Sequence, residues 1–381
     1  MFNNILTRLP SKQVARLRRV CKLWNAVLSE RSFIKSHLHH SIQADKQRGE
    51  VLLTFHNGFS FDHGCRLPFT ANLCRCPYYE YVGLMIKLPV NASSYVHGGS
   101  YVIGSVNGLI CFANCKNSFV IHLWNPSLSA LLAVPPYDFF SPYPNRYQIL
   151  FRFGFDPKTD DYKVVKFMYG HAIPGVETWL RMEVYSMRKG SWNHTTPPPL
   201  PHITTICDSN ERYVNDYDGY LHWFGYVVVD HDQGPRRQAI VAFDLCLETF
   251  SEISLPDSID NSSYYNAIGV LDGKLCVMSC SYSDTKYEVW VMNEYGAAES
   301  WVQNHVFSRF STGSSMVRPL GFTLHNKFIF EAPDEPLALY DPLEHQVSYF
   351  NISIMPSFRT KVVQYVDSLV WVSPLRSILR D

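Results

Sequence analysis

The sequence predicts a mainly β protein with a small helical segment at its N-terminus. Aromatic residues make up 14% of the 381 residues and charged residues only 18%, a balance that favours half-buried pleated surfaces over solvated helices. After about residue 50 the chain consists of strand-like runs separated by turns rich in Gly, Pro, Asn and Asp. Helical periodicity is confined to the residues before that point.

A repeating unit is visible in the β region. Its first half is a small turn residue followed by an apolar run, and copies begin at Asn107, Asp218 and Asp272, with weaker ones at His325 and Val366. Its second half is an apolar run around an aromatic residue, at Trp124, Tyr185, Phe243, Trp290 and Tyr340. The aromatic residues recur at intervals of 47 to 61 residues, close to the ~50 residues of a kelch-type blade.

This interval predicts a kelch-like β-propeller of five or six blades, each with four short strands. Stacking such units radially protects sheet edges that an open sheet would expose. The alternative is a pair of ordinary β-sandwiches in which the recurrence is accidental.

The N-terminal segment has the pattern of an amphipathic helix from Ser11 to Leu28, with Ser11 as its N-cap. Its apolar residues fall on one face, at Val14, Leu17, Val20, Cys21, Trp24 and Leu28. A second short helix is expected from Arg31 to His40. About 40 residues are too few to close an apolar core, so this segment needs a partner surface.

Charge is unevenly distributed along the chain. Residues 1–50 hold ten of the 34 basic residues but only three of the 34 acidic ones. The basic residues Lys12, Arg16, Arg18, Arg19 and Lys22 are not accompanied by a nucleic-acid-binding motif, so we expect solvated charge or an acidic protein partner. No run of about 18 apolar residues exists, and no membrane association is predicted.

The ten cysteines lack the spacing of a disulfide framework and indicate reduced thiols in the cytoplasm or nucleus, an expectation that the absence of a signal-peptide pattern supports. His63, Cys65, Cys74 and Cys76 lack the paired cysteines of a structural zinc site. We therefore predict no metal and no cofactor.

No catalytic motif is found. The chain has no G-x-S-x-G, no G-x-x-x-x-G-K-[ST] and no H-E-x-x-H. Asp156, Asp160 and Asp161 are better explained as a polar turn between two strands than as catalytic or metal-binding carboxylates. A propeller enzyme would need convergent carboxylates or metal ligands in a central channel.

The N-terminal residues resemble an F-box. The matching runs are Leu9 to Lys12, Arg18 to Asn25 and Phe33 to Leu38. The body resembles the F-box-associated domain of plant F-box proteins, the group that includes the S-locus and S-haplotype-specific members. Its matching runs include Gly104 to Cys111, Trp124 to Ser127, Phe153 to Val165, Val184 to Trp192 and Glu288 to Gly296.

The resemblance implies the substrate-recognition subunit of a Skp-cullin-F-box ubiquitin ligase, itself non-catalytic. An F-box over residues 1–40 binds the Skp adaptor and, through it, a cullin. Residues 41–99 form a connecting segment with the first strands, and residues 100–376 form the propeller-like domain that holds a target protein. In an S-locus protein acting in pollen self-incompatibility, that target is a secreted ribonuclease.

The expected binding residues follow from this division. Adaptor binding is assigned to Leu9, Pro10, Val14, Leu17, Val20, Cys21, Trp24 and Leu28. Substrate binding is assigned to the propeller loops through Tyr137, Phe139, Tyr143, His171, His202, His231 and Arg236, because loops carry variable binding groups on a rigid scaffold.

One departure from the family is expected to matter. F-boxes of this family usually begin some residues earlier, with an extra Leu-Pro and acidic residues, whereas this chain opens directly at Met1 and Phe2. Weakened adaptor binding is one expectation. The alternative function is a non-ligase interaction propeller with a degenerate F-box.

Overall fold

The structure, a computed structural model, describes residues 5–371 except for a series of connecting segments. The excepted segments are 50, 57–58, 61–64, 67–69, 76–79, 82–99, 115–119, 138–146, 171–178, 196–202, 208–217, 229–235, 260–265, 281–285, 309–316, 332–336 and 351–360. The chain forms two compact units. The first comprises Met1–Val134, Asp334–Leu337 and Tyr349–Ser373, and the second comprises Pro135–Pro333, Ala338–Ser348 and Pro374–Asp381.

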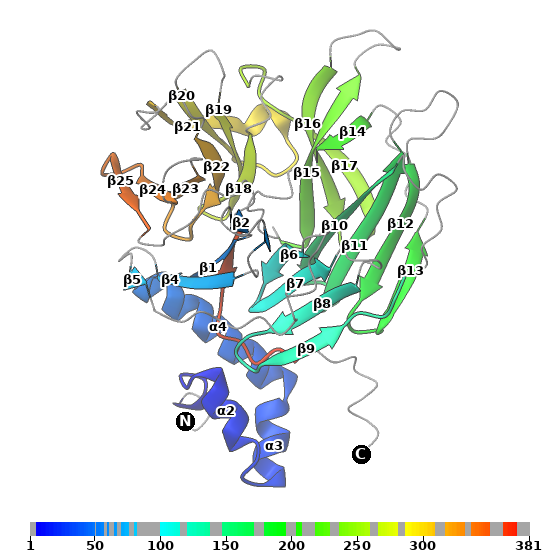
Figure 1. Cartoon of the computed structure of the whole chain (residues 1–381), viewed down its shortest axis with the longest axis vertical. Helices are drawn as coiled ribbons and strands as arrows, with labels where there is room; N and C mark the ends of the chain where they lie inside the picture. The colour runs from blue at the N-terminus through cyan, green and yellow to red at the C-terminus, as the bar shows by residue number, and fades with distance from the viewer. Residues whose placement is uncertain are drawn as a thin grey trace. The chain divides into compact units, whose positions relative to one another are not determined.

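Three helices lie at the start of the described chain and are drawn in blue in Figure 1. They are α2 (Ser11–Leu17), α3 (Lys22–Ser29) and α4 (Arg31–Arg48). The prediction of one continuous helix from Ser11 to Leu28 is therefore wrong. Cys21 has an extended backbone, and its Sγ accepts a hydrogen bond from the amide of Trp24, so it caps a new helix instead of continuing the old one.

Both ends of the helical segment also differ from the expectation. Pro10, not Ser11, occupies the N-cap position of α2, and no side chain of the cap residue satisfies the helix amides there. The last helix extends eight residues beyond His40, because residues 41–48 contain neither Gly nor Pro and several good helix formers. It ends at Gly49, whose φ of 97° stops the helix.

The first unit contains two four-stranded sheets. The closing blade has the order β26-β1-β4-β5 and joins the two ends of the chain, with β1 (Val51–His56), β4 (Thr70–Arg75), β5 (Glu80–Tyr81) and β26 (Lys361–Tyr365). The β6–β9 blade follows, with β6 (Ser100–Val106), β7 (Leu109–Asn114), β8 (Val120–Asn125) and β9 (Ala130–Ala133). A two-stranded ribbon is formed by β2 (Phe59–Ser60) and β3 (Cys65–Arg66).

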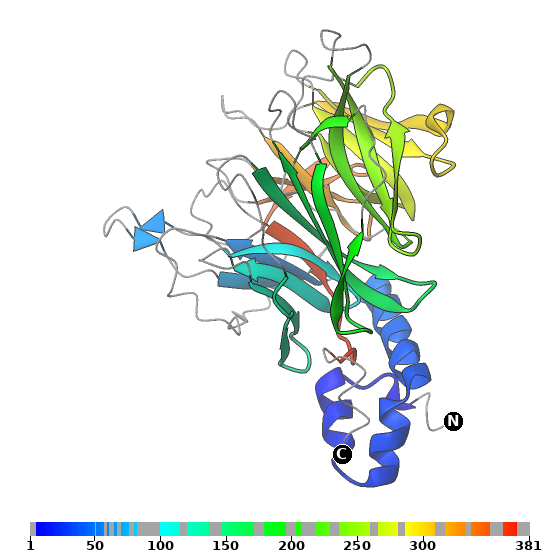
Figure 2. The same cartoon turned by 90° about the vertical axis from the view of Figure 1, so that its right-hand side faces the viewer.

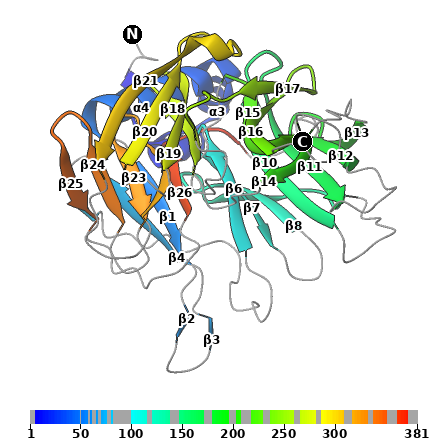
Figure 3. The same cartoon turned by 90° about the horizontal axis from the view of Figure 1, so that it is seen from above.

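The second unit contains four further four-stranded sheets, which Figure 3 shows in green, yellow and orange. The β10–β13 blade has β10 (Tyr147–Asp156), β11 (Asp161–Gly170), β12 (Trp179–Ser186) and β13 (Ser191–Thr195). The β14–β17 blade has β14 (Ile203–Cys207), β15 (Tyr220–Val228), β16 (Arg236–Asp244) and β17 (Thr249–Ser254). The β18–β21 blade has β18 (Ala267–Leu271), β19 (Lys274–Cys280), β20 (Lys286–Met292) and β21 (Trp301–Ser308), with a short 3₁₀ helix, η2 (Ala298–Ser300), before β21. The β22–β25 blade has β22 (Arg318–Phe322), β23 (Phe328–Glu331), β24 (Ala338–Asp341) and β25 (Gln346–Tyr349).

A left-handed residue precedes the second strand of four blades. Asn107, Asp218, Asp272 and Asn326 have φ values of 46° to 58°. Asn and Asp adopt this conformation more readily than other residues that carry a Cβ. These positions match the predicted starts of the repeating unit. The last predicted copy, at Val366, is different, because residues 366–370 follow β26 without forming a strand.

A polar residue ends the third strand of three blades and holds the following turn. Asp244 accepts hydrogen bonds from the amides two and three residues further on, at 2.7 and 2.9 Å, and Asp341 does so at 2.9 and 3.3 Å. Asn125 accepts one from the amide of Leu128 at 3.2 Å. Such local acceptors explain why these three apolar runs end in Asp or Asn.

Apolar clusters join neighbouring blades within the second unit. Phe167 of β11 packs on Trp223 of β15, with ring centroids 4.8 Å apart. Tyr287 of β20 packs on Phe330 of β23 at 5.1 Å and donates a hydrogen bond to the Val317 carbonyl. The predicted mainly β body is confirmed. Within the described residues no helix is long and apolar enough to span a membrane.

Candidate functional site

The helical segment packs around a small apolar cluster that includes residues from distant parts of the chain. Val14, Leu28 and Phe33 come from the helices and are 0%, 1% and 4% exposed. Leu369, from the segment after β26, is also fully buried there, and Leu128, from the turn between β8 and β9, packs against the cluster. The helices therefore close their core with help from two leucines of the β region.

Two apolar side chains at the corner between α2 and α3 face solvent. Val20 is 66% exposed and Leu23 is 71% exposed, and Cys21 between them is exposed as well. We name Val20, Cys21 and Leu23 the docking patch. Exposed apolar side chains that lie next to one another are candidate contacts for another protein.

Basic side chains surround the docking patch. Lys12, Arg16, Arg19 and Lys22 are exposed, and the sequence has no acidic residue before Glu30. Basic groups that are not neutralised by local acids create a positive potential that favours an acidic partner. An apolar centre with a charged rim is the usual anatomy of a protein-binding surface.

Arg18 stabilises the turn between α2 and α3, where the docking patch lies. Its guanidinium donates a hydrogen bond to the carbonyl of Leu28 at 2.7 Å, at the far end of α3. A cation at a helix C-terminus satisfies carbonyls that have no partner within the helix. The pKa of Arg18 is lowered by burial, which agrees with its position inside the corner.

The N-terminus of α2 is held from the other end of the chain. The amide of Ser11 donates to Asp367 Oδ2 at 2.7 Å, so this carboxylate replaces the missing N-cap. His37 of α4 is buried, and its Nε2 donates to the carbonyl of Leu9 at 2.8 Å. Burial lowers the pKa of His37, although the Leu9 carbonyl and the Asp367 carboxylate act in the opposite direction.

The residues after β26 are latched onto the β6–β9 blade. The Nδ2 of Asn125 donates to the carbonyls of Ser368 and Val370, at 3.0 and 2.7 Å. The hydroxyl of Ser127 accepts from the amide of Ser368 at 3.1 Å and lies 2.8 Å from the hydroxyl of Tyr365. Figure 2 shows this red segment close to the blue helices. We name Val366–Val370 the C-terminal segment.

Gly108 makes room for the same segment. A Cβ at this position would lie 2.4 Å from both the Ser368 Cβ and the Val366 carbonyl oxygen, and its φ is +80°. The motifs around Gly108 and Asn125 therefore serve the same purpose, which is to hold the C-terminal segment against the blade.

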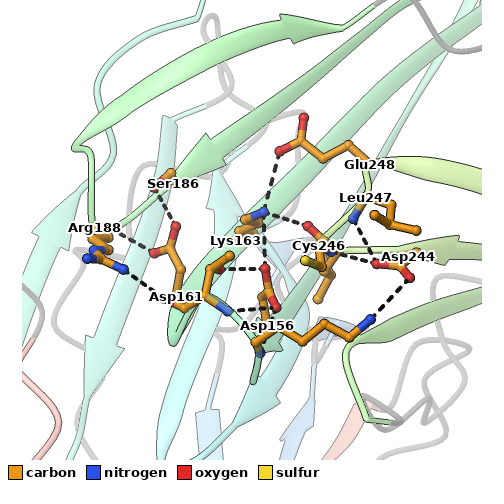
Figure 4. Close-up of polar contacts among 12 residues, drawn as sticks. Asp156, Asp161, Lys163, Ser186, Arg188, Asp244, Cys246, Leu247 and Glu248 are labelled. Carbon is orange, nitrogen blue, oxygen red and sulfur yellow. Dashed lines mark hydrogen bonds and ion pairs between the residues drawn. The ribbon is translucent and has the colours of Figure 1, made fainter.

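A second polar cluster joins two blades of the second unit and is drawn in Figure 4. Lys163 of β11 is buried, and its Nζ lies 3.4 Å from Asp156 Oδ2, 2.5 Å from the Leu245 carbonyl and 3.4 Å from Glu248 Oε1. The cluster thus links the β10–β13 blade to the β14–β17 blade.

The aspartates of this cluster hold turns. Asp156 accepts from the amides of Lys158 and Thr159 at 3.0 and 3.2 Å. Burial acts to raise the pKa of Asp156, but hydrogen bonds from the hydroxyl and amide of Thr159, together with Lys163, lower it below the usual value. Asp161 accepts from the Ser186 hydroxyl and from the Arg188 amide. The prediction of a polar turn at Asp156 to Asp161 is confirmed, since these carboxylates are used in turns and blade contacts.

Two domain families match the sequence in the arrangement that the structure shows. The F-box associated beta propeller domain matches residues 79–366, and the F-box domain matches residues 1–36. The chain belongs to the F-box-associated propeller family. The six four-stranded sheets are its blades, which confirms the predicted propeller and sets the number of blades at six.

Several curated relatives of this F-box protein come from Arabidopsis thaliana. The F-box protein CPR1 is 27% identical over 378 residues, which cover 94% of this chain and 84% of the relative. The F-box/kelch-repeat protein At3g23880 is 24% identical and is matched over 79% of this chain and 76% of its own length. These are plant F-box proteins, and nothing in their names points to the S-locus group.

Solved structures with a detectable likeness are more distant. The β-propeller domain of the Trilobed protease from Pyrococcus furiosus is 8% identical, with a TM-score of 0.40 over 82% of this chain and 95% of that domain. TolB from Acinetobacter baumannii is 12% identical, with a TM-score of 0.42 over 89% of this chain and 73% of TolB.

The residues predicted to bind the adaptor separate into two groups in the F-box. Val14 and Leu28 lie inside the apolar cluster, and Leu9, Leu17 and Trp24 are half-buried against it. Pro10, Val20 and Cys21 are exposed. Leu23 was not among the predicted residues, because on a continuous helix it falls off the apolar face. The break before Cys21 was the missing signal.

The predicted substrate-binding residues lie mostly outside the described part of the chain. Phe139, Tyr143, His171, His202 and His231 are outside it, and of Arg236 only the backbone, in β16, is described. Tyr137 is described, and its ring packs on Phe151 and Trp192 with the Lys166 Nζ 3.7 Å from its centroid.

The cysteines in the described part of the F-box protein are free thiols. They are Cys21, Cys74, Cys111, Cys246, Cys276 and Cys280. Burial raises the pKa of Cys111 and of Cys276 well above the usual value, so both are unreactive at neutral pH. No group of three or more potential metal ligands occurs among the described residues, and His63 is not among them.

Proposed function

We propose that this protein is the substrate-recognition subunit of a Skp-cullin-F-box ubiquitin ligase. The observation that carries the proposal is the docking patch: an F-box whose Val20 and Leu23 are exposed within a basic surround. F-box proteins are generally adaptor subunits that leave ubiquitin transfer to other components. The propeller then holds the target through its loops, in the cytoplasm or nucleus.

Adaptor binding is tested at the exposed residues, because changing them leaves the apolar cluster intact. The full chain with Leu23→Asp would be compared with the wild type for binding to a purified Skp adaptor by biolayer interferometry. Placing a charge at the centre of an apolar interface is expected to weaken binding by about 100-fold. Leu343→Asp is the matched control, since Leu343 is an 85% exposed leucine on the propeller.

The outcome separates the ligase subunit from its alternative. A wild-type chain that does not bind the adaptor would support a non-ligase interaction propeller with a degenerate F-box. If neither Leu23→Asp nor Leu343→Asp changes adaptor binding, the docking patch is not the adaptor-binding surface. An adaptor-bound wild type with an intact complex containing cullin would support ligase membership.

The role in pollen self-incompatibility remains a prediction that rests on the S-locus resemblance alone. Its test is direct binding between the purified chain and a secreted style ribonuclease. The general search for a target is a pull-down with the proteasome inhibited, in which a target would be enriched by the wild type and by Leu23→Asp alike.

A further inference from the structure

The C-terminal segment, Val366–Val370, directly follows the last strand of the closing blade and contributes a side chain to the core of the F-box. Directly before it, β26 pairs with β1 from Val51 to Phe55 and completes the closing blade. Directly within it, Leu369 completes the apolar cluster of the helices. One short stretch of chain therefore finishes two structures whose other parts come from the N-terminal end (Figure 1).

The contacts on the blade side are specific to this position. Asn125, Asp244 and Asp341 end corresponding strands and all hold the following turn through Oδ1. Asn125 is the amide among them, and its Nδ2 donates to two carbonyls of the C-terminal segment. A carboxylate has no hydrogen to donate, so the amide at this turn is explained by the segment that it holds.

The contacts on the helix side reach every part of the F-box core. Leu369 packs in the cluster that contains Val14 of α2, Leu28 of α3 and Phe33 of α4. Asp367 accepts from the amide of Ser11 at the start of α2. The helices α2 and α3, of 7 and 8 residues, are too short to be stable alone, so most of their stability must come from packing.

We propose that the F-box of this protein is a composite domain, in which α2 and α3 reach their docking conformation only when the C-terminal segment is latched in place. Adaptor docking then depends on the completion of the closing blade, and a chain whose last strand is not paired presents no ordered docking patch. The ligase would thereby accept only receptors with a closed propeller. The adaptor part of this inference rests on the proposed function.

The test uses the full chain with Leu369→Asp, and with Trp371→Asp as the matched control. Trp371 lies two residues further on and is 51% exposed, so a charge there leaves the cluster intact. Amide hydrogen exchange, measured by mass spectrometry without adaptor, is expected to become at least about tenfold faster in α2 and α3 of Leu369→Asp only. Leu369→Met, which conserves volume, is expected to retain wild-type protection.

Exchange in β15 and β19 of the same molecules shows whether the second unit remains folded. If Leu369→Asp also loses protection there, the milder Asp367→Ala decides, because it removes only the acceptor at the start of α2. The composite domain would be overturned if α2 and α3 kept wild-type protection in Leu369→Asp. If Leu369→Asp unfolds the second unit, the same result in Asp367→Ala would overturn it.

Adaptor affinity is the second measurement. It is expected to fall at least about tenfold in Leu369→Asp and to be unchanged in Trp371→Asp, in parallel with the exchange result. Unchanged affinity in Leu369→Asp would overturn the dependence of docking on the latch. If the wild type itself does not bind, the proposed function fails, and hydrogen exchange alone then decides whether the F-box is composite.

Discussion

The helical segment and the blades differ in how far along the chain their stabilising contacts reach. In the β10–β13 blade, Asp156 holds a turn through amides two and three residues away, and each strand pairs with the next one in the sequence. In the F-box, the amide of Ser11 meets Asp367, 356 residues away, and Val14 shares a cluster with Leu369. The β10–β13 blade is built from local contacts, whereas the F-box depends on a distant one, so the two regions should respond differently to substitution.

The largest effect is expected in a blade core. Trp223→Ala removes a 1% exposed side chain that packs on Phe167 and lies 5.3 Å from the Arg152 guanidinium. The cavity and lost contacts should lower the free energy of unfolding of the second unit by about 4 kcal/mol, measured by urea denaturation. Leu247→Ala, at a 67% exposed position, is the control and should change it by less than about 0.5 kcal/mol.

Gly108→Ala tests the contact between the β6–β9 blade and the C-terminal segment. Gly108 and Gly273 both have positive φ values, 80° and 72°, so alanine is strained at either position. Only at Gly108 would the new Cβ also collide with Ser368 and the Val366 carbonyl. Thermal unfolding should show a loss of about 3 kcal/mol for Gly108→Ala and about 1 kcal/mol for Gly273→Ala. Equal losses would mean that the C-terminal segment is not held against Gly108.

Asn125→Asp and Asp244→Asn exchange the same two side chains at corresponding turns. Asn125→Asp removes two donated hydrogen bonds and places a carboxylate against two carbonyls, which should cost about 2 to 3 kcal/mol at pH 7. Asp244→Asn keeps an Oδ1 acceptor for its turn. It loses the charge that pairs at 4.0 Å with Lys158, whose side chain is 63% exposed, and that accepts from the Tyr220 hydroxyl. It should cost less than about 1 kcal/mol. Comparable losses in chemical denaturation would contradict a special role for the amide.

The smallest expected effect depends on pH and concerns a blade. His222 is fully buried, its Nε2 lies 2.9 Å from the hydroxyl of Tyr295, and burial lowers its pKa from 6.5 to about 3. The unfolded chain therefore takes up this proton first as the pH falls below 6.5. The stability that neutral His222 provides is present above that pH and is lost progressively towards pH 3.

Linkage gives the size of this effect. Between pH 7 and pH 5, His222 alone should reduce the free energy of unfolding by about 2 kcal/mol. His222→Gln retains a partner for the Tyr295 hydroxyl but does not titrate. Urea denaturation at both pH values should show a smaller decrease in the variant than in the wild type, by about that amount. An identical decrease in both would show that another group is responsible.

Local features of the sequence predicted most of the blades. Asn107 and Asp272 were recognised as turn starts because left-handed backbone favours their residue types. The break between α2 and α3 was not recognised, because Val20, Cys21 and Trp24 also fit the apolar face of one continuous helix. Periodicity reports which residues could share a face, but it does not report whether the helix is continuous.

The docking patch and the contacts of the C-terminal segment were harder to predict from the sequence. Leu23 became a candidate docking residue only once α3 was seen to begin at Lys22, with the Leu23 side chain exposed to solvent. The repeat pattern predicted that one more blade unit starts at Val366, so Asp367 and Leu369 were assigned to a strand. Nothing nearby in the sequence connects these two residues to the F-box.

The mainly β body, its repeat of about 50 residues and the F-box at its start could be predicted from local sequence, because turn chemistry and strand alternation act between close neighbours. Which apolar side chains of the F-box are buried and which are exposed could be seen only in the folded chain. That choice depends on Leu369 and Leu128, which fill the helical core from distant parts of the chain. Burial is a property of the completed packing, and no local pattern contains it.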